Sequence, residues 1–330
     1  MKALLIRLDK IGDLISTVPC DEILPPQIVG HWMISKGLGE VLQAATPKRQ
    51  WTEFNKKYSF KQLVLFIQFL RQNHFDFAVS FQAPWWVSFG LWFAGVPLRF
   101  GTQSQWHHFL FLNHGLRQKR SKALQHEAEY NGDLIDHALH RLGLAEARHP
   151  VPSLKLLAPG VWKKPVQLTK YFVVHPGMAG SARNWPQSKY IQTIELLLKD
   201  ENLHGILTGT SLDEPYLTDI KSHFVNHPRF HVYQNKLKMS ELLDCIKQAE
   251  FVLAPSTGVL HLSASLGQKT LGIYSPILVQ HPTRWAPRGN HVSLFVPEVK
   301  CPAQHKCLGE QCPEYDCMLK ITPEQVIAAK

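Results

Sequence analysis

The chain has 330 residues, more than one hydrophobic core usually organises, so two domains are expected. Hydrophobic residues make up 45% and charged residues 19%, with a net charge of +10, which excludes a disordered chain and favours an anionic partner. The amino-terminal apolar run is too short for a signal peptide and no segment has ~20 consecutive apolar residues, so we expect a cytoplasmic protein with reduced cysteines.

The first half of the chain alternates short apolar runs with amphipathic stretches, which is typical of an α/β layer structure. Residues 2–8 and 75–81 are predicted strands, and helical spacing of apolar residues predicts helices from Asp13, over 60–73 and over 126–142. Residues 150–165 contain four prolines and no periodicity, so they are predicted to link two domains.

The second half repeats this α/β pattern. Predicted strands cover residues 171–175, 205–208, 251–254 and 270–274, and predicted helices cover 190–199, 239–248 and 259–266. The sequence therefore favours two Rossmann-like domains joined by the proline-rich segment.

A basic stretch lies in the first half, because no acidic residue occurs between Asp76 and Glu127. Phospholipid head groups and a phosphorylated glycolipid are the anionic partners that such a stretch suits, and a solvated basic face without a ligand is the alternative. No zinc-finger, RNP-type or basic-zipper pattern accompanies it, which argues against nucleic acid. The basic residues are Arg99, Arg117, Lys119, Arg120 and Lys122, with His107, His108, His114 and His126.

Three junctions lead from a predicted strand through a loop into a helix, at residues 7–13, 175–185 and 255–261. In an open parallel sheet, ligands bind beyond the carboxyl ends of the strands, where such junctions lie. Ser256, Thr257 and Gly258 offer hydroxyl groups, a glycine and free helix N–H groups, which suit a diphosphate. An ordinary helix cap is the alternative.

The other two junctions offer charged side chains. Arg183 follows a loop with Gly177, Gly180 and Ser181 and could neutralise a diphosphate, although Trp185-Pro186 could equally be a structural staple. Asp13 follows Gly12 at a helix start, where the helix dipole is expected to keep it ionised. An ionised carboxylate in an interdomain cleft can act as a general base, and a helix cap is again the alternative.

Together these motifs resemble glycosyltransferase family 9, the ADP-heptose:lipopolysaccharide heptosyltransferases. Residues 7–19 (RLDKIGDLISTVP) resemble its amino-terminal signature, and residues 175–177 (HPG) with 181–186 (SARNWP) are similar to its second motif. Residues 256–258 (STG), with His261 and residues 274–276 (YSP), resemble the third. The motifs occur in the family's order over essentially the whole chain.

The resemblance implies an α/β GT-B fold, with two Rossmann-like domains facing a cleft. Residues 1–160 would bind the acceptor, residues 161–300 the nucleotide sugar, and residues 301–330 would form a cysteine-containing tail whose closing helix packs on the N-terminal domain. It implies transfer with inversion and without a metal or cofactor, from a nucleotide diphosphate sugar such as ADP-heptose to a lipopolysaccharide core or related anionic glycolipid. The enzyme would lie peripherally at the inner face of the cytoplasmic membrane.

The same resemblance assigns the site residues. Asp13 is the expected base, and Lys10 and Arg120 are expected to contact the acceptor. The chain departs from the family at Ser256, where an acidic residue is usual, and at Arg183, where lysine is common. A catalytically weak homologue that binds a nucleotide or glycan in envelope assembly is the alternative function. The expected donor-binding residues are Gly177, Ser181, Arg183, Ser256, Thr257, Gly258 and His261.

The tail contains four cysteines within 17 residues, Cys301, Cys307, Cys312 and Cys317, with His305 between them. Their spacing matches no standard CxxC zinc motif, so we interpret them as structural or unliganded thiols. A zinc site and disulfides are the alternatives.

Overall fold

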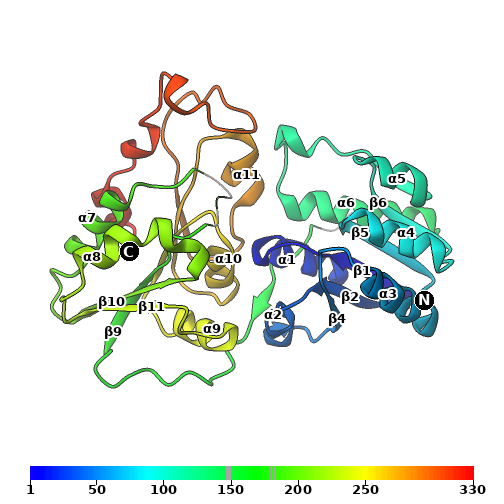
Figure 1. Cartoon of the computed structure of the whole chain (residues 1–330), viewed down its shortest axis with the longest axis horizontal. Coiled ribbons are helices and arrows are strands. Elements are labelled where there is room, and N and C mark those ends of the chain that lie inside the picture. The colour runs from blue at the N-terminus through cyan, green and yellow to red at the C-terminus, as the bar shows by residue number, and fades with distance from the viewer. Residues whose placement is uncertain (146–149, 179, 181–182) are drawn as a thin grey trace. The chain divides into compact units, whose positions relative to one another are not determined.

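The computed structural model describes residues 1–145, 150–178, 180 and 183–330 of the chain (Figure 1). These residues form two compact units. The N-terminal unit contains Met1–Arg120 and Gln125–Leu154, and the C-terminal unit contains Ser121–Leu124 and Lys155–Lys330. The division at Leu154 and Lys155 falls inside the proline-rich segment, and each unit has its own sheet.

The N-terminal unit is built on a six-stranded sheet of order β4-β2-β1-β5-β6-β7, in which every pair of neighbours is parallel. Counted along the chain without the two-residue strand β3, this is the order 3-2-1-4-5-6 of the Rossmann fold. The strands are β1 (Lys2–Arg7), β2 (Val29–Ser35), β3 (Ala45–Thr46), β4 (Gln50–Phe54), β5 (Phe77–Gln82), β6 (Leu98–Thr102) and β7 (His114–Leu116).

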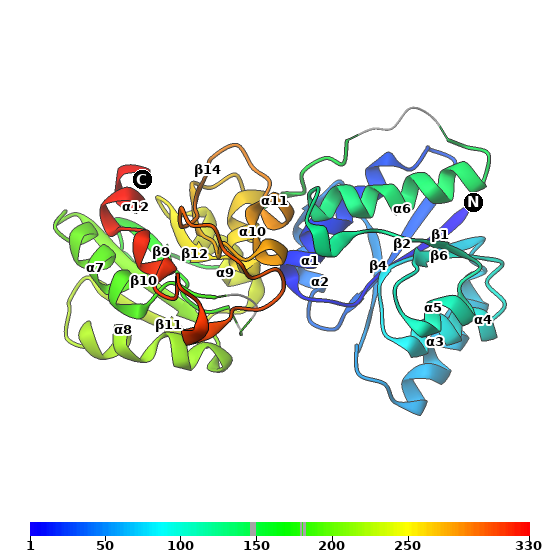
Figure 2. The same ribbon diagram turned by 90° about the horizontal axis from the view of Figure 1, so that it is seen from above.

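Helices cover both faces of this sheet: α1 and α6 lie on one face, and α3, α4 and α5 on the other (Figure 2). Helix α3 begins where Ser59 accepts a hydrogen bond from the Gln62 N–H, and it ends at His74 in the left-handed conformation. The helices are α1 (Ile11–Thr17), α2 (Gly39–Ala44), α3 (Phe60–Asn73), α4 (Trp85–Phe93), α5 (Trp106–Phe111) and α6 (Glu127–Arg141), with 3₁₀ turns at Val18–Ile23 and Arg120–Lys122.

The C-terminal unit repeats the plan. Its sheet has the order β11-β10-β9-β12-β13-β14, again all parallel and again 3-2-1-4-5-6. The strands are β8 (Lys155–Leu156), β9 (Lys170–Val174), β10 (Leu203–Gly209), β11 (Phe230–Gln234), β12 (Val252–Pro255), β13 (Thr270–Ile273) and β14 (Val292–Phe295). The helices are α7 (Gln187–Leu197), α8 (Thr218–His223), α9 (Met239–Lys247), α10 (Gly258–Ser265), α11 (Pro282–Trp285) and α12 (Pro323–Ala328), with 3₁₀ turns at Ser211–Tyr216, Leu278–Gln280, Gly309–Gln311 and Cys317–Lys320.

The prediction that the closing helix packs on the N-terminal domain is wrong. Helix α12 packs against α7 of the C-terminal unit, and Met318, Ile321 and Val326 are buried in that unit's core. The Trp185 indole N–H donates to the Ile321 carbonyl at 3.2 Å. The tail packs on the C-terminal unit because its apolar side chains complete the hydrophobic core of that unit.

The basic stretch forms a surface only in part. His107 and His108 are buried, and the Arg99 guanidinium donates to the backbone carbonyls of Phe111 and Val96 at 2.7 and 2.6 Å. Arg99 therefore ties α5 to strand β6, and His107 hydrogen-bonds to Ser88 of α4 at 3.2 Å, so these side chains do not form the predicted basic surface. Exposed positions of the stretch include Arg117, Lys119 and Lys122.

No helix in the described part of the chain is long and apolar enough to cross a membrane. The predicted alternation of strands and helices is confirmed in both halves, including the strand at the amino terminus and the helices over 60–73 and 126–142.

Candidate active site

The first candidate site lies at the carboxyl edge of the N-terminal sheet. Strand order reverses between β1 and β5, and ligands of open parallel sheets bind at this position. Arg7 is the last residue of β1, Asp13 lies in the first turn of α1, and Glu127 is the first residue of α6. The fold therefore brings two helix starts and one strand end together.

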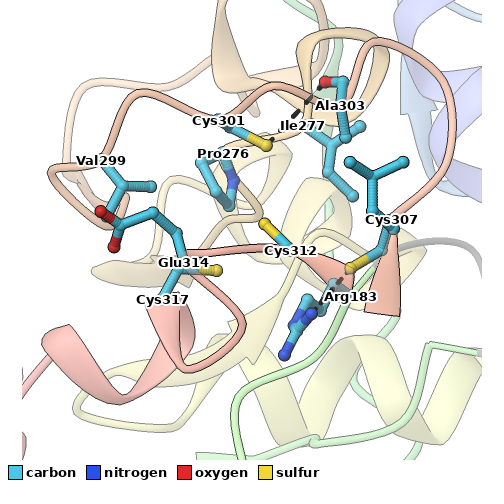
Figure 3. Close-up of a pocket in the computed structure, with 11 residues that line it drawn as sticks. Arg183, Pro276, Ile277, Val299, Cys301, Ala303, Cys307, Cys312, Glu314 and Cys317 are labelled. Atoms are coloured by element: carbon cyan, nitrogen blue, oxygen red, sulfur yellow. Dashed lines mark hydrogen bonds between the residues drawn. The ribbon is translucent and has the colours of Figure 1, made fainter. Parts of the chain in front are cut away.

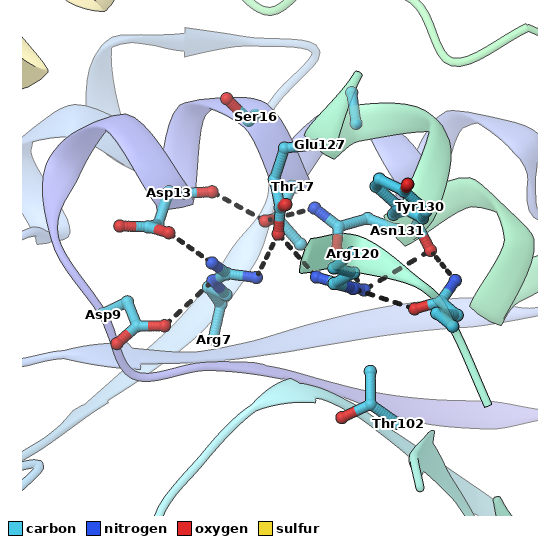
Figure 4. A network of polar contacts seen from close by, with 12 residues as sticks. Arg7, Asp9, Asp13, Ser16, Thr17, Thr102, Arg120, Glu127, Tyr130 and Asn131 are labelled. Carbon is cyan, nitrogen blue, oxygen red and sulfur yellow. Dashed lines mark hydrogen bonds and ion pairs between the residues drawn. The ribbon is translucent and has the colours of Figure 1, made fainter. Parts of the chain in front are cut away.

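Arg7 is the centre of a buried ion-pair network (Figure 4). Its side chain is 3% exposed and pairs with Asp13, with Asp9 at 3.4 Å and with Glu127 at 3.6 Å. Burial lowers the pKa of Arg7, but the charges of Asp13, Glu127 and Asp9 outweigh burial and raise that pKa overall. Arg7 is therefore a permanent cation surrounded by three carboxylates.

The pKa of Asp13 is raised above the ordinary value for aspartate. Burial is the main cause; the charges of Asp9 and Glu127 add to it, and Arg7 opposes it. The position of Asp13 at a helix start is expected to keep it ionised, but burial and the charges of Arg7, Asp9 and Glu127 determine its pKa instead. Its side chain remains 22% exposed, so a substrate can reach the carboxylate although Arg7 beneath it is covered.

The two predicted acceptor contacts differ in their surroundings. Arg120 pairs with Glu127 at 2.5 Å and donates to Asn131 Oδ1 at 3.1 Å, so it belongs to the Asp13 network through a shared carboxylate. Lys10 is exposed at the N-cap of α1. Contact of either side chain with an acceptor stays a prediction. Glu127 was missed from the sequence, although it stands out as the residue that ends the acid-free stretch.

The second candidate site lies at the reversal point of the C-terminal sheet, between β9 and β12. Thr257 is the N-cap of α10 and makes no capping bond with its side chain, and Gly258 begins the helix. His175 follows β9 and shares a 3.0 Å hydrogen bond between its Nδ1 and Thr208 Oγ1. Burial lowers the pKa of His175 to about 4 despite the charge of Asp213, so this imidazole is neutral at physiological pH.

Gly177 allows a close approach that no other residue would. A Cβ atom at this position would lie 2.2 Å from Cγ of Asp213. Asp213 in turn accepts hydrogen bonds at 2.8 Å from both the backbone N–H and the hydroxyl of Thr210. The glycine of the second motif therefore makes room for a buried carboxylate that was not identified from the sequence.

The remaining predicted donor residues are not all at this edge. His261 lies one helical turn after the half-buried start of α10 and is buried, and Ser256 is half-buried. Ser181 lies outside the described residues. Arg183 turns to the tail: Nη1 donates to Cys307 Sγ at 2.7 Å, Nη2 donates to the Tyr315 carbonyl, and the guanidinium lies 4.6 Å from the Tyr315 ring centre.

Four tail cysteines line one pocket with Arg183 (Figure 3). All six cysteines are free thiols, and no three His, Cys, Asp or Glu side chains within the described ranges are arranged to hold a metal ion. Burial raises the pKa of Cys307, but hydrogen bonds from Gly309 and Arg183 and the arginine charge outweigh it and lower the pKa overall. The absence of a cofactor and the zinc alternative stay predictions.

Two parallel Rossmann-like sheets, each with a polar site at its reversal point, define the GT-B architecture. The sequence profile of glycosyltransferase family 9 (heptosyltransferase) matches residues 64–315, and the chain belongs to this family. It is a glycosyltransferase, as the motif resemblance predicted.

The similarity to known proteins covers nearly the whole chain. A Haemophilus influenzae protein provisionally named a glycosyltransferase is 27% identical over 317 residues, which is 91% of this chain and 90% of the relative. The structure of E. coli ADP-heptose lps heptosyltransferase II has a TM-score of 0.76 at 16% identity and covers 100% of this chain and 97% of its own. E. coli heptosyltransferase WaaC with ADP has a TM-score of 0.69 at 16% identity, covering 99% and 98%.

Proposed function

We propose that this enzyme transfers heptose from ADP-heptose, with inversion and without a metal, to a lipopolysaccharide core or a related anionic glycolipid. In this reaction the acceptor oxygen bonds to the anomeric carbon, the bond from that carbon to the diphosphate breaks, and ADP leaves. The acceptor proton passes to the enzyme. The C-terminal unit binds the donor and the N-terminal unit binds the acceptor at the membrane's inner face.

The donor assignment rests on the edge between β9 and β12. The uncapped start of α10 offers backbone N–H groups and the Thr257 hydroxyl to a diphosphate. Two solved structures that match this fold contain ADP and an ADP-heptose analogue, and both are heptosyltransferases, which supports the same donor here.

The acceptor assignment rests on Asp13, and this is the observation that carries the proposal. Its carboxylate is accessible, is anchored by Arg7, and has a raised pKa, so it is a stronger base than an ordinary aspartate. A carboxylate remains far less basic than an alkoxide, so the proton moves only as the new bond forms. Arg7 is buried, so it does not contact a substrate itself, and its role is to position the Asp13 carboxylate.

A nucleotide screen followed by a transfer assay tests the proposal. ADP at ~100 times its dissociation constant should stabilise the protein by about 2.7 kcal/mol, whereas UDP and GDP at the same concentration should stabilise it less. The product formed from ADP-heptose should have the opposite anomeric configuration from the donor. Stabilisation by UDP or GDP alone would refute the donor, and retention of configuration would refute the single-displacement mechanism.

A further inference from the structure

An aromatic face of the N-terminal unit remains uncovered on α4 and α5, and we call it the α4–α5 face. Six large apolar side chains on these two helices are between 39% and 64% exposed. The helices contact each other on the sheet face opposite α1 and α6 (Figure 2). The six side chains are Trp85, Trp92, Phe93, Trp106, Phe109 and Leu110.

The α4–α5 face is continuous on α4 and at its contact with α5. The half-buried Phe89 ring lies 5.8 Å from Trp92, 5.7 Å from Phe93 and 5.5 Å from Phe111 of α5, measured between ring centres. A whole aromatic side chain offers 150–250 Å², so the six half-exposed groups present roughly 600 Å² of apolar surface. This is at the upper end of the largest apolar patch on a typical monomer, about 300–600 Å².

The edge of the α4–α5 face is cationic. The Arg71 guanidinium lies 5.8 Å from the Phe93 ring centre, and the Arg117 guanidinium lies 5.9 Å from that of Phe109. Lys119 follows Arg117 in the N-terminal unit and is exposed. The whole segment from residue 77 to residue 126 contains no acidic residue. An aromatic centre with a positive rim is the chemistry that anionic bilayers recognise.

We propose that the α4–α5 face is the membrane-docking surface of this enzyme, with its aromatic side chains inserted at the interface of an anionic phospholipid bilayer. This deepens the proposed function, because it names the surface that brings the acceptor site to its lipid-linked substrate. A second copy of the chain fits less well: a two-fold symmetric contact centred on this face would bring the same positive rim of each copy together.

Vesicle sedimentation of the full chain tests the docking surface. Wild type should bind vesicles of equimolar phosphatidylcholine and phosphatidylglycerol and should bind phosphatidylcholine vesicles weakly. Changing Trp106→Ser and Leu110→Ser together should weaken binding at least tenfold, and Arg117→Gln should weaken it about fivefold, as expected for one basic residue near an anionic surface. The matched control is Leu212→Ser with Val225→Ser, two apolar residues of the C-terminal unit that are 76% and 73% exposed, and it should bind as wild type does.

Three results would overturn the proposal. The Trp106/Leu110 variant could bind vesicles as wild type does, or the control variant could lose binding to the same extent. In the third result, neither wild type nor the Trp106/Leu110 variant binds vesicles, and wild type is a dimer that the substitutions dissociate. Stabilisation by ADP, measured on the same proteins, distinguishes failure of the docking proposal from failure of the proposed function. The Trp106/Leu110 variant should keep that stabilisation. Its absence from wild type would contradict the donor assignment and leave the docking result standing.

Discussion

Glu127 offers a sensitive test of the active-site electrostatics, because its charge raises the pKa of Asp13 without touching a substrate. The variant Glu127→Gln removes that charge and keeps the shape of the side chain. If Asp13 must be ionised to act as a base, turnover falls as pH drops through its pKa. Lowering the pKa therefore moves this acid limb of the pH profile to lower pH.

The structure sets the direction of the shift. Glu127 and Asp13 contact different nitrogens of the Arg7 guanidinium. Because both carboxylates share one cation, the negative charge of Glu127 disfavours ionisation of Asp13 and raises its pKa. Removing that charge should therefore lower the pKa of Asp13 and move the acid limb to lower pH.

The assay is kcat with saturating donor and acceptor across pH, with thermal unfolding measured on the same samples. Glu127→Gln leaves Arg7 and Arg120 with one carboxylate fewer, which should cost up to about 3 kcal/mol of stability. The control is Glu22→Gln, which breaks an ion pair with Arg49 instead. An acid limb that stays in place in Glu127→Gln, or shifts equally in Glu22→Gln, would refute the role of this network.

Two further predictions concern the C-terminal unit. Gly177→Ala should destabilise the protein by about 1–3 kcal/mol in urea unfolding, because Asp213 must move to admit the new methyl group. Gly30→Ala, where the nearest atom to the added Cβ lies at 3.3 Å, should cost less, and equal effects would contradict the close approach of Asp213 to Gly177. Iodoacetamide should alkylate Cys307 faster than buried Cys245, as measured by peptide mass spectrometry. Arg183→Met should slow alkylation of Cys307, and an unchanged rate would show that Arg183 does not favour the Cys307 thiolate.

Much of the fold could be predicted from local patterns. Strands and helices follow from apolar spacing, and the carboxyl ends of parallel strands place Asp13 and Gly258 at sheet edges whatever the rest of the chain does. The closing helix could not be placed in this way. Its apolar residues show that it packs, but the choice of partner depends on which core has room for Ile321 and Val326.

The contacts that set the chemistry were beyond sequence reasoning because they join distant residues. Arg7 meets Glu127, and Arg183 meets Cys307 although 124 positions separate them. Charge counting failed for the same reason at Arg99, because its guanidinium donates to the backbone carbonyls of Phe111 and Val96. A count of basic residues gives the sign of a surface only after burial is known.

The central claim is that Asp13 is the general base, and turnover of Asp13→Asn beside Asp9→Asn tests it most directly. Asp9 is the matched control because it also pairs with Arg7 and additionally with Lys56 at 2.5 Å. We expect Asp13→Asn to bind ADP normally and to lose at least ~100-fold in kcat, whereas Asp9→Asn loses much less. Turnover of Asp13→Asn at the wild-type rate would contradict the account.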